Sequence, residues 1–490
     1  MNPDPPNSTA RPPSQGASAA AGGRAGARRW RALAVCLVAG FMTLLDVSIV
    51  NVALPTVRTG LHMSESGLQW VLSGYALAFG LVLVPAGRLG DARSRRAVFL
   101  TGLALFTLAS ALAGAAQGQT WLVLARLFQG AAGGVLVPQV SGFIQTLFQG
   151  AERGRAFGAL GSTIGVSTAV GPLLGGLLIH LFGPQDGWRW VFLVNLPIGI
   201  AALPVAYHLL PPPPPADERA GHRDFDPVGV VLLGGGTVVL LLPFVQAQQW
   251  HSPARWLLLP VAVLLLGAFV GWERHYARRR EPLVNMELFA VRPYAAGVAL
   301  SLVYFAGFTA IFFIFTLYLQ AGLHYSALAA GLSITPFAVG SAVSAALGGR
   351  VVTRLGRRLV VFGLVLVLVG LGASVLAVRL GPGTWAGWAT AVPLLVAGTG
   401  SGLVISPNQT LTLSQVPLAR AGSAGGVLQT AQRVGSAVGI AIVGSVFFAH
   451  ARGRNPDWAL AFELGATVAA GLVLAALVVA TMDLVAGRTR

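Results

Sequence analysis

A carboxyl group and a guanidinium lie deep inside two of the apolar segments in the N-terminal half of this 490-residue sequence. Asp46 interrupts the apolar segment near 31–54, and Arg126 interrupts the segment near 119–147. Ionisation is costly for a carboxyl group that water does not reach, so such a group binds a proton more readily than one in water. Asp46 is therefore a candidate proton carrier. The alternative is a carboxylate held permanently in a static network of hydrogen bonds.

Arg126 is predicted to lie at the same depth as Asp46. Asp46 lies nine residues before Pro55, at the end of its segment, and Arg126 lies about seven residues after Gln119, at the start of the other. At about 1.5 Å per helical residue, both lie roughly 10–14 Å from the same boundary. A cation there favours the ionised carboxyl and so helps it to release a proton. We predict a proton-coupling pair, with a permanent structural ion pair as the alternative.

A second polar cluster follows the second apolar segment. Gly87 is followed by Asp91, Arg95 and Arg96. An acid at one helix terminus and arginines at the next can form a conformational latch that holds one state closed. Arginines that only fix the orientation in the membrane are the alternative, but this alternative does not explain Asp91.

Small residues and a proline mark the fifth apolar segment, at Gly165, Gly171, Pro172, Gly175 and Gly176. Glycines allow helices to approach closely, whereas proline removes a helical hydrogen bond and bends the helix. A bent, closely packed helix could seal one conformation against proton leak. Ordinary packing of small residues is the alternative for each glycine.

Further polar residues inside apolar segments are candidates for a substrate cavity. They are Asn51, Gln129, Gln139 and Arg433. Arg433 lies about ten residues into its segment, near the middle of the membrane, where it could bind an anionic group of a substrate or only backbone carbonyls. Aromatic residues are also frequent in these segments, but none is assigned a role, because such residues are more often lipid-facing or part of the core.

The composition indicates an all-α integral membrane protein. Hydrophobic residues make up 55% of the chain and charged residues 10%, whereas a soluble domain carries roughly 25% charged residues. Fourteen segments are long and apolar enough to cross a bilayer as helices. They lie near 31–54, 68–87, 97–116, 119–147, 155–182, 188–210, 228–247, 255–273, 295–320, 328–348, 358–379, 386–407, 423–449 and 459–482.

The arginines orient these segments. With the N-terminus inside, 25 arginines fall in inner loops and tails and six in outer loops, as the positive-inside rule requires. We therefore expect both termini in the cytoplasm and the protein in a bacterial cytoplasmic membrane. The net charge of +17 does not indicate a nucleic-acid partner, because the basic residues are dispersed between apolar segments.

An internal repeat divides the chain into two six-helix halves. The segment GRLGDARSRR at 87–96 aligns with GRVVTRLGRR at 349–358, and each lies between the second and third helix of its half. Such repeats are typical of secondary transporters, which bind substrate between the repeats. We predict a disordered tail at 1–30, an N-terminal bundle at 31–210, a linker with two extra helices at 211–294, a C-terminal bundle at 295–485 and a tail at 486–490.

These patterns resemble the major facilitator superfamily, in particular its fourteen-helix drug:proton antiporters of the EmrB/QacA type. The resemblance covers about residues 30–485 and rests on LDVSIVNVALP (45–55), GRLGDARSRR (87–96), RLFQGAAGG (126–134), GVSTAVGPLLGG (165–176) and WRWVFLVNLPIG (188–199). The loop at 87–96 departs from the superfamily pattern at Ala92, where arginine is usual, and at Ser94, where glycine is usual.

The resemblance implies two six-helix bundles with two inserted helices, and proton-coupled export of drugs or other small, largely hydrophobic compounds by alternating access. A dedicated exporter of a lipid, siderophore or natural product remains an alternative, as does an uptake carrier. No enzyme is expected, because the sequence shows no nucleophile–base, paired-acid or metal constellation. The expected partners are a small-molecule substrate, protons and lipid, without cofactor or metal, for a monomer driven by the proton gradient.

Overall fold

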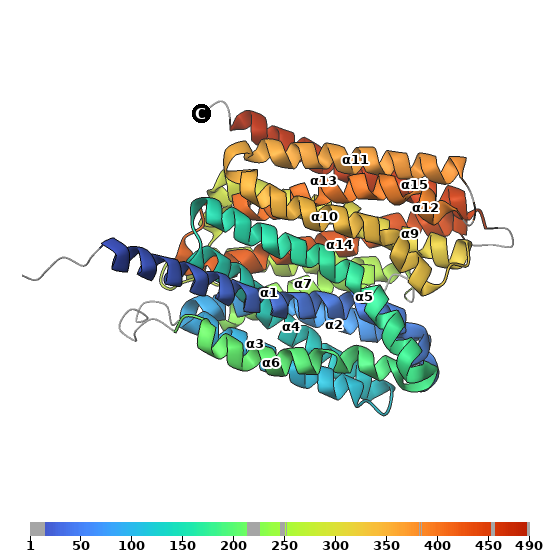
Figure 1. The fold of residues 1–490 in the computed structure, drawn as a ribbon, viewed down its shortest axis with the longest axis horizontal. Coiled ribbons are helices and arrows are strands. Elements are labelled where there is room, and N and C mark those ends of the chain that lie inside the picture. Colours follow the sequence, from blue (N-terminus) through green and yellow to red (C-terminus); the bar gives the residue numbers. More distant parts are fainter. Residues whose placement is uncertain are drawn as a thin grey trace, which may run out of the picture.

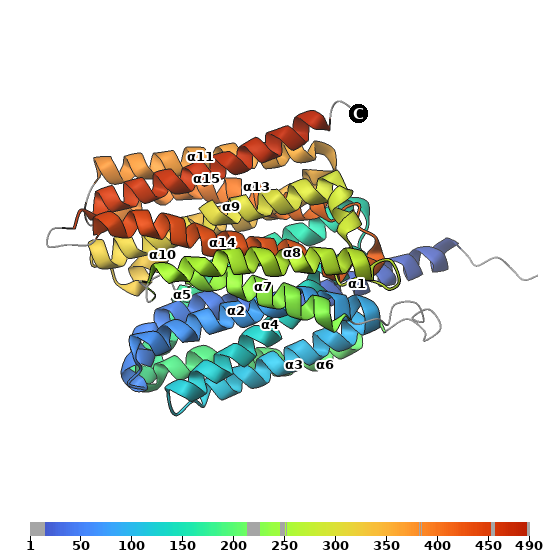
Figure 2. The same ribbon diagram turned by 180° about the vertical axis from the view of Figure 1, so that it is seen from behind.

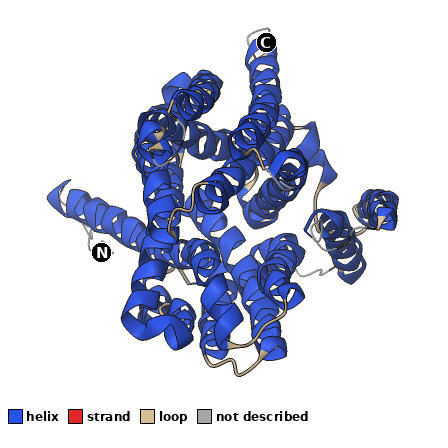
Figure 3. Cartoon of the chain, turned by 90° about the vertical axis from the view of Figure 1, so that its right-hand side faces the viewer, coloured by secondary structure: helices blue, strands red, loops and turns tan. Residues whose placement is uncertain are grey.

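The computed structural model describes residues 15–212, 226–245, 250, 252–381, 383, 385–451 and 456–487. Within these residues the chain forms helices and no strands, so the all-α prediction is confirmed. The long helices run roughly side by side along one direction (Figure 1). An end-on view shows them as a bundle whose members are joined by short loops (Figure 3).

The N-terminal half contains six long helices. They are α1 (Gln15–Gly60), α2 (Glu65–Leu89), α3 (Arg95–Gly114), α4 (Gln119–Leu147), α5 (Gly150–Leu193) and α6 (Asn195–Leu209). The short π-helix Gly90–Ser94 joins α2 to α3.

Two inserted helices and the C-terminal half follow. The insertion consists of α7 (Pro227–Val245) and α8 (Leu258–Tyr276). The C-terminal half comprises α9 (Arg292–Leu317), α10 (Ala327–Leu355), α11 (Arg357–Leu380), the short α12 (Ala386–Ala389), α13 (Ala391–Thr412), α14 (Ala421–Ala451) and α15 (Trp458–Ala486). α7 packs against α2 and α14, so the insertion lies beside a contact between the two halves (Figure 2).

The second helix of each half begins with the same local structure. The hydroxyl of Ser64 accepts the backbone amide of Gly67 before α2, and that of Ser326 accepts the amide of Ala329 before α10. A serine in this position satisfies one of the amides that lack a partner in a first helical turn. The matching caps are what the internal repeat predicts.

The helix count agrees with the predicted number of spans. Thirteen continuous helical segments of the described chain are long and apolar enough to cross a membrane. One of them, Ser66–Gly114, contains two predicted spans, because the π-helix follows α2 directly and α3 starts at the next residue. The fourteen predicted spans are therefore all represented.

The first helix starts earlier than predicted. α1 begins at Gln15, so the prediction of a disordered tail at 1–30 is wrong for residues 15–30. The last proline of the tail is Pro13, and the residues after it are rich in alanine, which is the best helix former. The rest of that predicted tail, and most of the polar segment after Pro211, lie outside the described residues.

Large apolar side chains face outward from the bundle, as lipid contact requires. Trp388 exposes 78% of its surface, and Val263 and Leu264 on α8 expose 67% and 72%. Each half also has a buried apolar core. Phe106 in the N-terminal half and Phe447 in the C-terminal half are fully buried. Only a surrounding bilayer makes the outer apolar surface favourable.

The two halves meet mainly along two helix pairs, α2 with α14 and α5 with α10. The start of α1 and the end of α15 lie at the same end of the bundle (Figure 1), which we call the terminal face. The π-helix Gly90–Ser94 lies at this face, because α2 returns the chain to the end from which α1 departs.

Candidate functional site

Asp46 and Arg126 form an ion pair inside the N-terminal half. The Arg126 guanidinium nitrogen NH1 lies 2.6 Å from Asp46 Oδ2. Almost none of either side chain is exposed, 0% for Asp46 and 1% for Arg126. The proximity predicted from their equal depth in α1 and α4 is confirmed. Their role in proton coupling stays a prediction.

Three further polar side chains complete the surroundings of Asp46. Gln129 Nε2 and Asn195 Nδ2 donate to Asp46 Oδ1 at 2.8 and 3.3 Å. The Ser110 hydroxyl accepts from the same two amides at 2.8 and 3.3 Å. Four helices, α1, α3, α4 and α6, thus contribute to the surroundings of one carboxylate. Charge-assisted hydrogen bonds of this kind stabilise a charge that burial has removed from water.

Arg126 is also held independently of Asp46. Its Nε donates to the Val71 carbonyl at 3.1 Å, and its guanidinium carbon lies 4.1 Å from the centroid of the Tyr75 ring. Arginine stays charged at physiological pH. The contacts with Val71 and Tyr75 therefore hold in place a charge that Asp46 balances across the ion pair.

A cavity of about 160 Å³ adjoins the ion pair. Helices α1, α2, α4 and α14 line it, through Val47, Asn51, Leu72, Tyr75, Ala76, Phe79, Arg126 and Arg433. Pockets for drug-sized ligands usually hold about 300–1,000 Å³. A ligand of that size therefore requires the lining helices to move apart. Arg126 both lines the cavity and holds Asp46, so the cavity and the carboxyl share one neighbour.

Two of the four predicted cavity residues lie elsewhere. Gln129 turns toward Asp46, and the Gln139 amide donates to the Ala86 carbonyl at 2.8 Å, near the terminal face. Neither lines this cavity, and their place in a substrate cavity stays a prediction. Asn51 and Arg433 do line the cavity. Polarity inside a span does not by itself tell whether an amide faces a cavity or a neighbouring helix.

Sequence reasoning missed Ser110 and Asn195 as partners in the carboxylate network. A serine in an apolar helix is common and gives no signal. Asn195 had one, because it is the amide side chain in the apolar stretch WRWVFLVNLPIG at 188–199. A buried amide needs polar partners, and Asp46 supplies one of them.

A family model described as the Major Facilitator Superfamily matches residues 36–440. This chain belongs to that superfamily. The matched range contains Asp46, Arg126 and every residue that lines the cavity. The family predicted from the sequence motifs is confirmed, and the protein is a multi-pass membrane transporter for small molecules.

Known members of the superfamily with similar sequences include antibiotic exporters and resistance proteins. A probable actinorhodin transporter of Streptomyces coelicolor is 40% identical over 86% of this chain and 73% of its own length. A puromycin resistance protein of Streptomyces alboniger is 36% identical, covering 86% and 82%. A tetracenomycin C resistance and export protein of Streptomyces glaucescens is 33% identical, covering 88% and 78%. These relatives agree with the predicted drug:proton antiporter type.

Solved structures of the superfamily show the same fold at low sequence identity. The crystal structure of a human organic anion transporter superposes with a TM-score of 0.65 at 16% identity, covering 92% of this chain and 99% of that one. A proton:xylose symporter gives a TM-score of 0.63 at 15% identity, covering 92% and 95%. At these identities the likeness shows the fold alone, and it confirms the predicted superfamily architecture.

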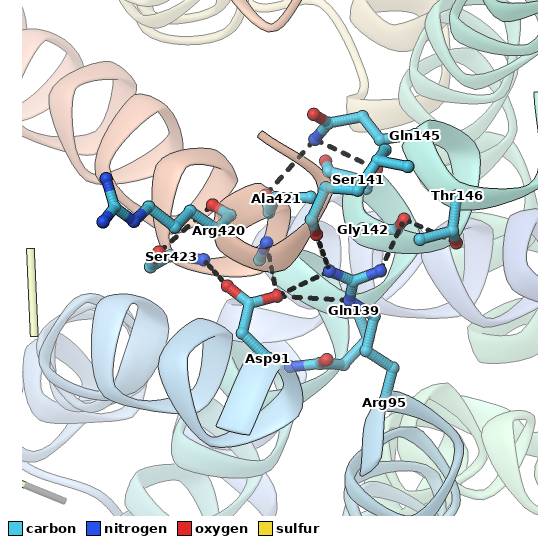
Figure 4. A network of polar contacts seen from close by, with 12 residues as sticks. Asp91, Arg95, Gln139, Ser141, Gly142, Gln145, Thr146, Arg420, Ala421 and Ser423 are labelled. Atoms are coloured by element: carbon cyan, nitrogen blue, oxygen red, sulfur yellow. Dashed lines mark hydrogen bonds and ion pairs between the residues drawn. The ribbon is translucent and has the colours of Figure 1, made fainter. Parts of the chain in front are cut away.

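The loop between α2 and α3 makes polar contacts with the start of α14 at the terminal face (Figure 4). Asp91 pairs with Arg95 at 2.7 Å and accepts the backbone amides of Gly422 and Ser423 at 2.9 and 2.8 Å. These amides belong to the first turn of α14, where they lack helical partners and the helix dipole favours negative charge. Arg95 also donates to the Leu418 carbonyl at 2.6 Å. Asp91 and Arg95 thus join the two halves, and their role as a latch in transport stays a prediction.

Arg96 does not take part in this junction. Its guanidinium carbon lies 4.4 Å from the centroid of the Tyr207 ring on α6, within the N-terminal half, and its role as a latch residue stays a prediction. Ser94, where glycine is usual in the superfamily, accepts the amide of Ala97 at 3.2 Å and so caps α3. This departure from the superfamily pattern therefore has a structural role in the turn.

Two glycines of the predicted antiporter motif bring α5 against α1 close to Asp46. A Cβ on Gly171 would lie 1.9 Å from Ser48 Oγ, and one on Gly175 would lie 2.9 Å from Ile49 Cγ1. The Ser48 hydroxyl also lies 3.1 Å from the Ser167 carbonyl, to which it donates. α5 thus contacts the helix that carries the candidate proton carrier, which is the packing predicted for these two positions.

The other residues of the motif differ from one another. A Cβ on Gly165 would lie 2.9 Å from the Ala338 carbonyl oxygen, so this glycine serves the contact between α5 and α10. The prediction that Gly176 allows close helix packing is wrong, because a Cβ at this position would meet nothing within 4 Å. The path of α5 breaks at Gly183, where φ is 85°, and not at Pro172, which keeps helical dihedral angles. Only glycine adopts such a φ without strain.

Proposed function

We propose that this transporter exports small, largely hydrophobic organic compounds in exchange for protons, by alternating access. The observation that carries the proposal is the buried Asp46–Arg126 pair, whose arginine lines the cavity. Export is supported by the antibiotic resistance and export proteins among its relatives. The proposed transporter acts as a monomer without cofactor, and the proton gradient supplies the energy.

Exchange requires that proton and substrate do not occupy the transporter together. Protonation of Asp46 removes the counter-ion of Arg126, and an uncompensated guanidinium beside a cavity attracts water. A hydrated cavity disfavours an apolar substrate, because the water that the substrate must displace is then strongly bound. Loss of the proton restores the ion pair, so the charge of Arg126 is again balanced at the cavity wall. In this scheme Arg126 transmits the protonation state of Asp46 to the substrate.

Alternating access requires that the two ends of the cavity open in turn. Asp91 and Arg95 hold α14 against the loop after α2, so the terminal face is closed in this conformation. We propose that the terminal face is the cytoplasmic one and that both termini lie inside a bacterial cytoplasmic membrane, as the arginine distribution predicts. Breaking the Asp91 contacts would then admit substrate from the cytoplasm.

Everted membrane vesicles with an acidic lumen test this proposal. Substrate-evoked proton release from the lumen is expected in the wild type and not in Asp46→Asn, which keeps the shape of the side chain but cannot exchange a proton. Asp186→Asn is the matched control, because 69% of the Asp186 side chain is exposed and it pairs only with the nearby Arg189 among described residues. Coupled export that survives in Asp46→Asn at equal expression would remove Asp46 from the mechanism.

A dedicated natural-product exporter is the second candidate function. Two similar proteins are named for one compound each, actinorhodin and tetracenomycin C. A panel of cationic dyes, antibiotics and native metabolites in the same vesicles separates the two candidates. Transport of many unrelated compounds supports a multidrug exporter, and transport of one structural class supports a dedicated one.

A further inference from the structure

We propose that Arg433 selects the substrate class of this cavity: uncharged aromatic compounds that carry oxygen hydrogen-bond acceptors, with organic cations excluded. This inference rests on the proposed function, because it concerns the same cavity. It concerns equilibrium binding, however, and so can be tested without any proton gradient.

Arg433 reaches the cavity from the middle of α14. The helix extends from Ala421 to Ala451, so Arg433 lies far from both ends, where an arginine would reach lipid headgroups. Its guanidinium carbon lies 4.6 Å from the centroid of the Phe79 ring on α2. Within the described part of the chain, Arg433 makes no hydrogen bond and no ion pair. Backbone carbonyls, the alternative partners considered from the sequence, do not accept its protons in this conformation.

The two cavity arginines therefore differ in their charge balance. Arg126 is neutralised by Asp46 and also donates to Gln129 and to Val71. Arg433 faces an aromatic ring, which attracts a cation but accepts no strong hydrogen bond. The residues that line the cavity include no acid. The guanidinium of Arg433 is thus a set of unused donors at the wall of an otherwise apolar site.

Unused donors inside an apolar site select ligands that supply acceptors. A site that is built to hydrogen-bond a ligand oxygen discriminates strongly against an analogue without it, because the buried polar group is then left unpaired. The net positive charge of the cavity lining acts in the opposite direction on a cation, which it repels at short range. Carbonyl or phenolic oxygens meet both conditions.

The neighbouring rings define the rest of the ligand. Tyr75 and Phe79 lie one helical turn apart on α2, with ring centroids 5.9 Å apart and planes inclined by 25°. Both line the cavity beside Arg433. Tyr75 and Phe79 expose only 4% and 2% of their surfaces in this conformation, so a ligand reaches them when the lining helices move apart. Aromatic neighbours of this kind favour a ligand that is itself a flat aromatic body. The ligand chemistry that fits all of these groups is an aromatic ring system that bears oxygen acceptors.

Three small bicyclic probes of similar shape test the proposal by equilibrium binding to the purified transporter. Menadione offers two carbonyl acceptors and no charge, 2-methylnaphthalene offers neither acceptor nor charge, and N-methylquinolinium is a cation. We expect the wild type to bind menadione at least about tenfold more tightly than either of the others. In Arg433→Leu, the affinity for menadione should fall to that for 2-methylnaphthalene, and N-methylquinolinium should bind more tightly than to the wild type.

Two further variants separate specificity from folding. Arg433→Lys keeps the charge and some donors, so it should still exclude the cation and recover part of the menadione affinity. Arg278→Gln removes the same charge from an exposed position outside the cavity and should bind all three probes as the wild type does. A wild type that does not prefer menadione, or Arg433→Leu with unchanged menadione affinity, would overturn the proposal. The vesicle assay with Asp46→Asn tests proton-coupled export separately, so either proposal can fail without the other.

Discussion

Gly87 on α2 lies directly against the backbone carbonyl of Gly422 in the first turn of α14. A Cβ on Gly87 would lie 2.3 Å from that carbonyl oxygen. The aligned glycine of the second half, Gly349, has the same relation to Gly154 on α5, also at 2.3 Å. Two closely packed backbone contacts therefore join the two halves near the terminal face at matching places of the two repeats, and both depend on the absence of a side chain.

Gly87→Ala should open the terminal face. The methyl group cannot be accommodated without separating α2 from α14, and overpacking of this kind costs about 1–3 kcal/mol. A cysteine introduced at Ser423, in a background in which Cys36 is replaced by serine, should react with a water-soluble maleimide on the order of tenfold faster than without the glycine substitution. Gly372→Ala is the control, because a Cβ there meets nothing within 4 Å. Equal labelling rates in the two variants would show that this contact does not keep the face closed.

Asp91→Asn should have the same effect through electrostatics. The amide keeps the shape of the side chain but loses the charge that pairs with Arg95 and one of the two acceptors for the α14 amides. Hydrogen bonds to charged groups contribute about 1.5–3 kcal/mol each, so the closed state should lose roughly that much. Arg96→Gln provides the contrast, because Arg96 contacts only the N-terminal half through Tyr207 in the described structure.

The cysteine-labelling assay distinguishes these two variants. Asp91→Asn should label faster than the unsubstituted background, and Arg96→Gln should label at the background rate. If both label equally fast, the closed state does not depend specifically on the Asp91 junction.

The glycines of α5 should differ sharply in their tolerance of alanine. Gly171→Ala places a methyl group on Ser48 and must push α5 away from α1 close to Asp46, whereas Gly176→Ala adds a methyl group to open space. We expect Gly171→Ala to abolish coupled export and to raise passive proton leak through proteoliposomes at equal protein content. Gly176→Ala should behave as the wild type in both measurements. A leak of equal size in the two variants would show that the sequence motif does not act through close packing.

Length and polarity alone predict much of this molecule. The equal depth of Asp46 and Arg126 can be predicted because a helix rises by a fixed distance per residue. Counting residues from the end of each span therefore gives the depth of each side chain. Equal depth, together with the cost of leaving either charge unpaired, predicts contact between the two side chains, and the structure places them 2.6 Å apart. The internal repeat can also be detected in the sequence, because both halves need a glycine where two helix backbones touch, at Gly87 and at Gly349.

What the sequence could not give is the rotation of each helix about its axis. Gln129 and Gln139 are equally polar and lie on the same helix, yet one binds Asp46 and the other binds the Ala86 carbonyl. Asn195 on α6 donates to the carboxylate, and Ser110 on α3 accepts from the amides of Asn195 and Gln129. Such convergence depends on how the helices pack, which single-residue polarity does not encode.

The inserted helices hold an unusual pair of acids at their ends near the terminal face. The carboxyl groups of Asp226 and Glu273 both face Gly229, where a Cβ would lie 2.4 Å from Asp226 Oδ2 and 2.6 Å from Glu273 Oε1. Asp226 accepts the Gly229 amide at 2.9 Å and the Trp272 indole at 2.9 Å. Glu273 Oε2 accepts the Val284 amide at 3.2 Å, while Oε1 has no partner among the described residues.

Glu273→Gln should therefore leave the thermal stability of the purified protein unchanged or raise it. The glutamine oxygen can still accept the Val284 amide, and its NH₂ group can donate to Asp226 in place of a second carboxylate that repels it. Glu273→Leu should lower the stability, because the Val284 amide then loses its acceptor, at a cost of about 1–3 kcal/mol. Thermal unfolding of the two variants in detergent measures the difference. If Glu273→Gln destabilises the protein as much as Glu273→Leu does, the fold needs the charge of Glu273, and repulsion between the two acids is not the dominant effect at this site.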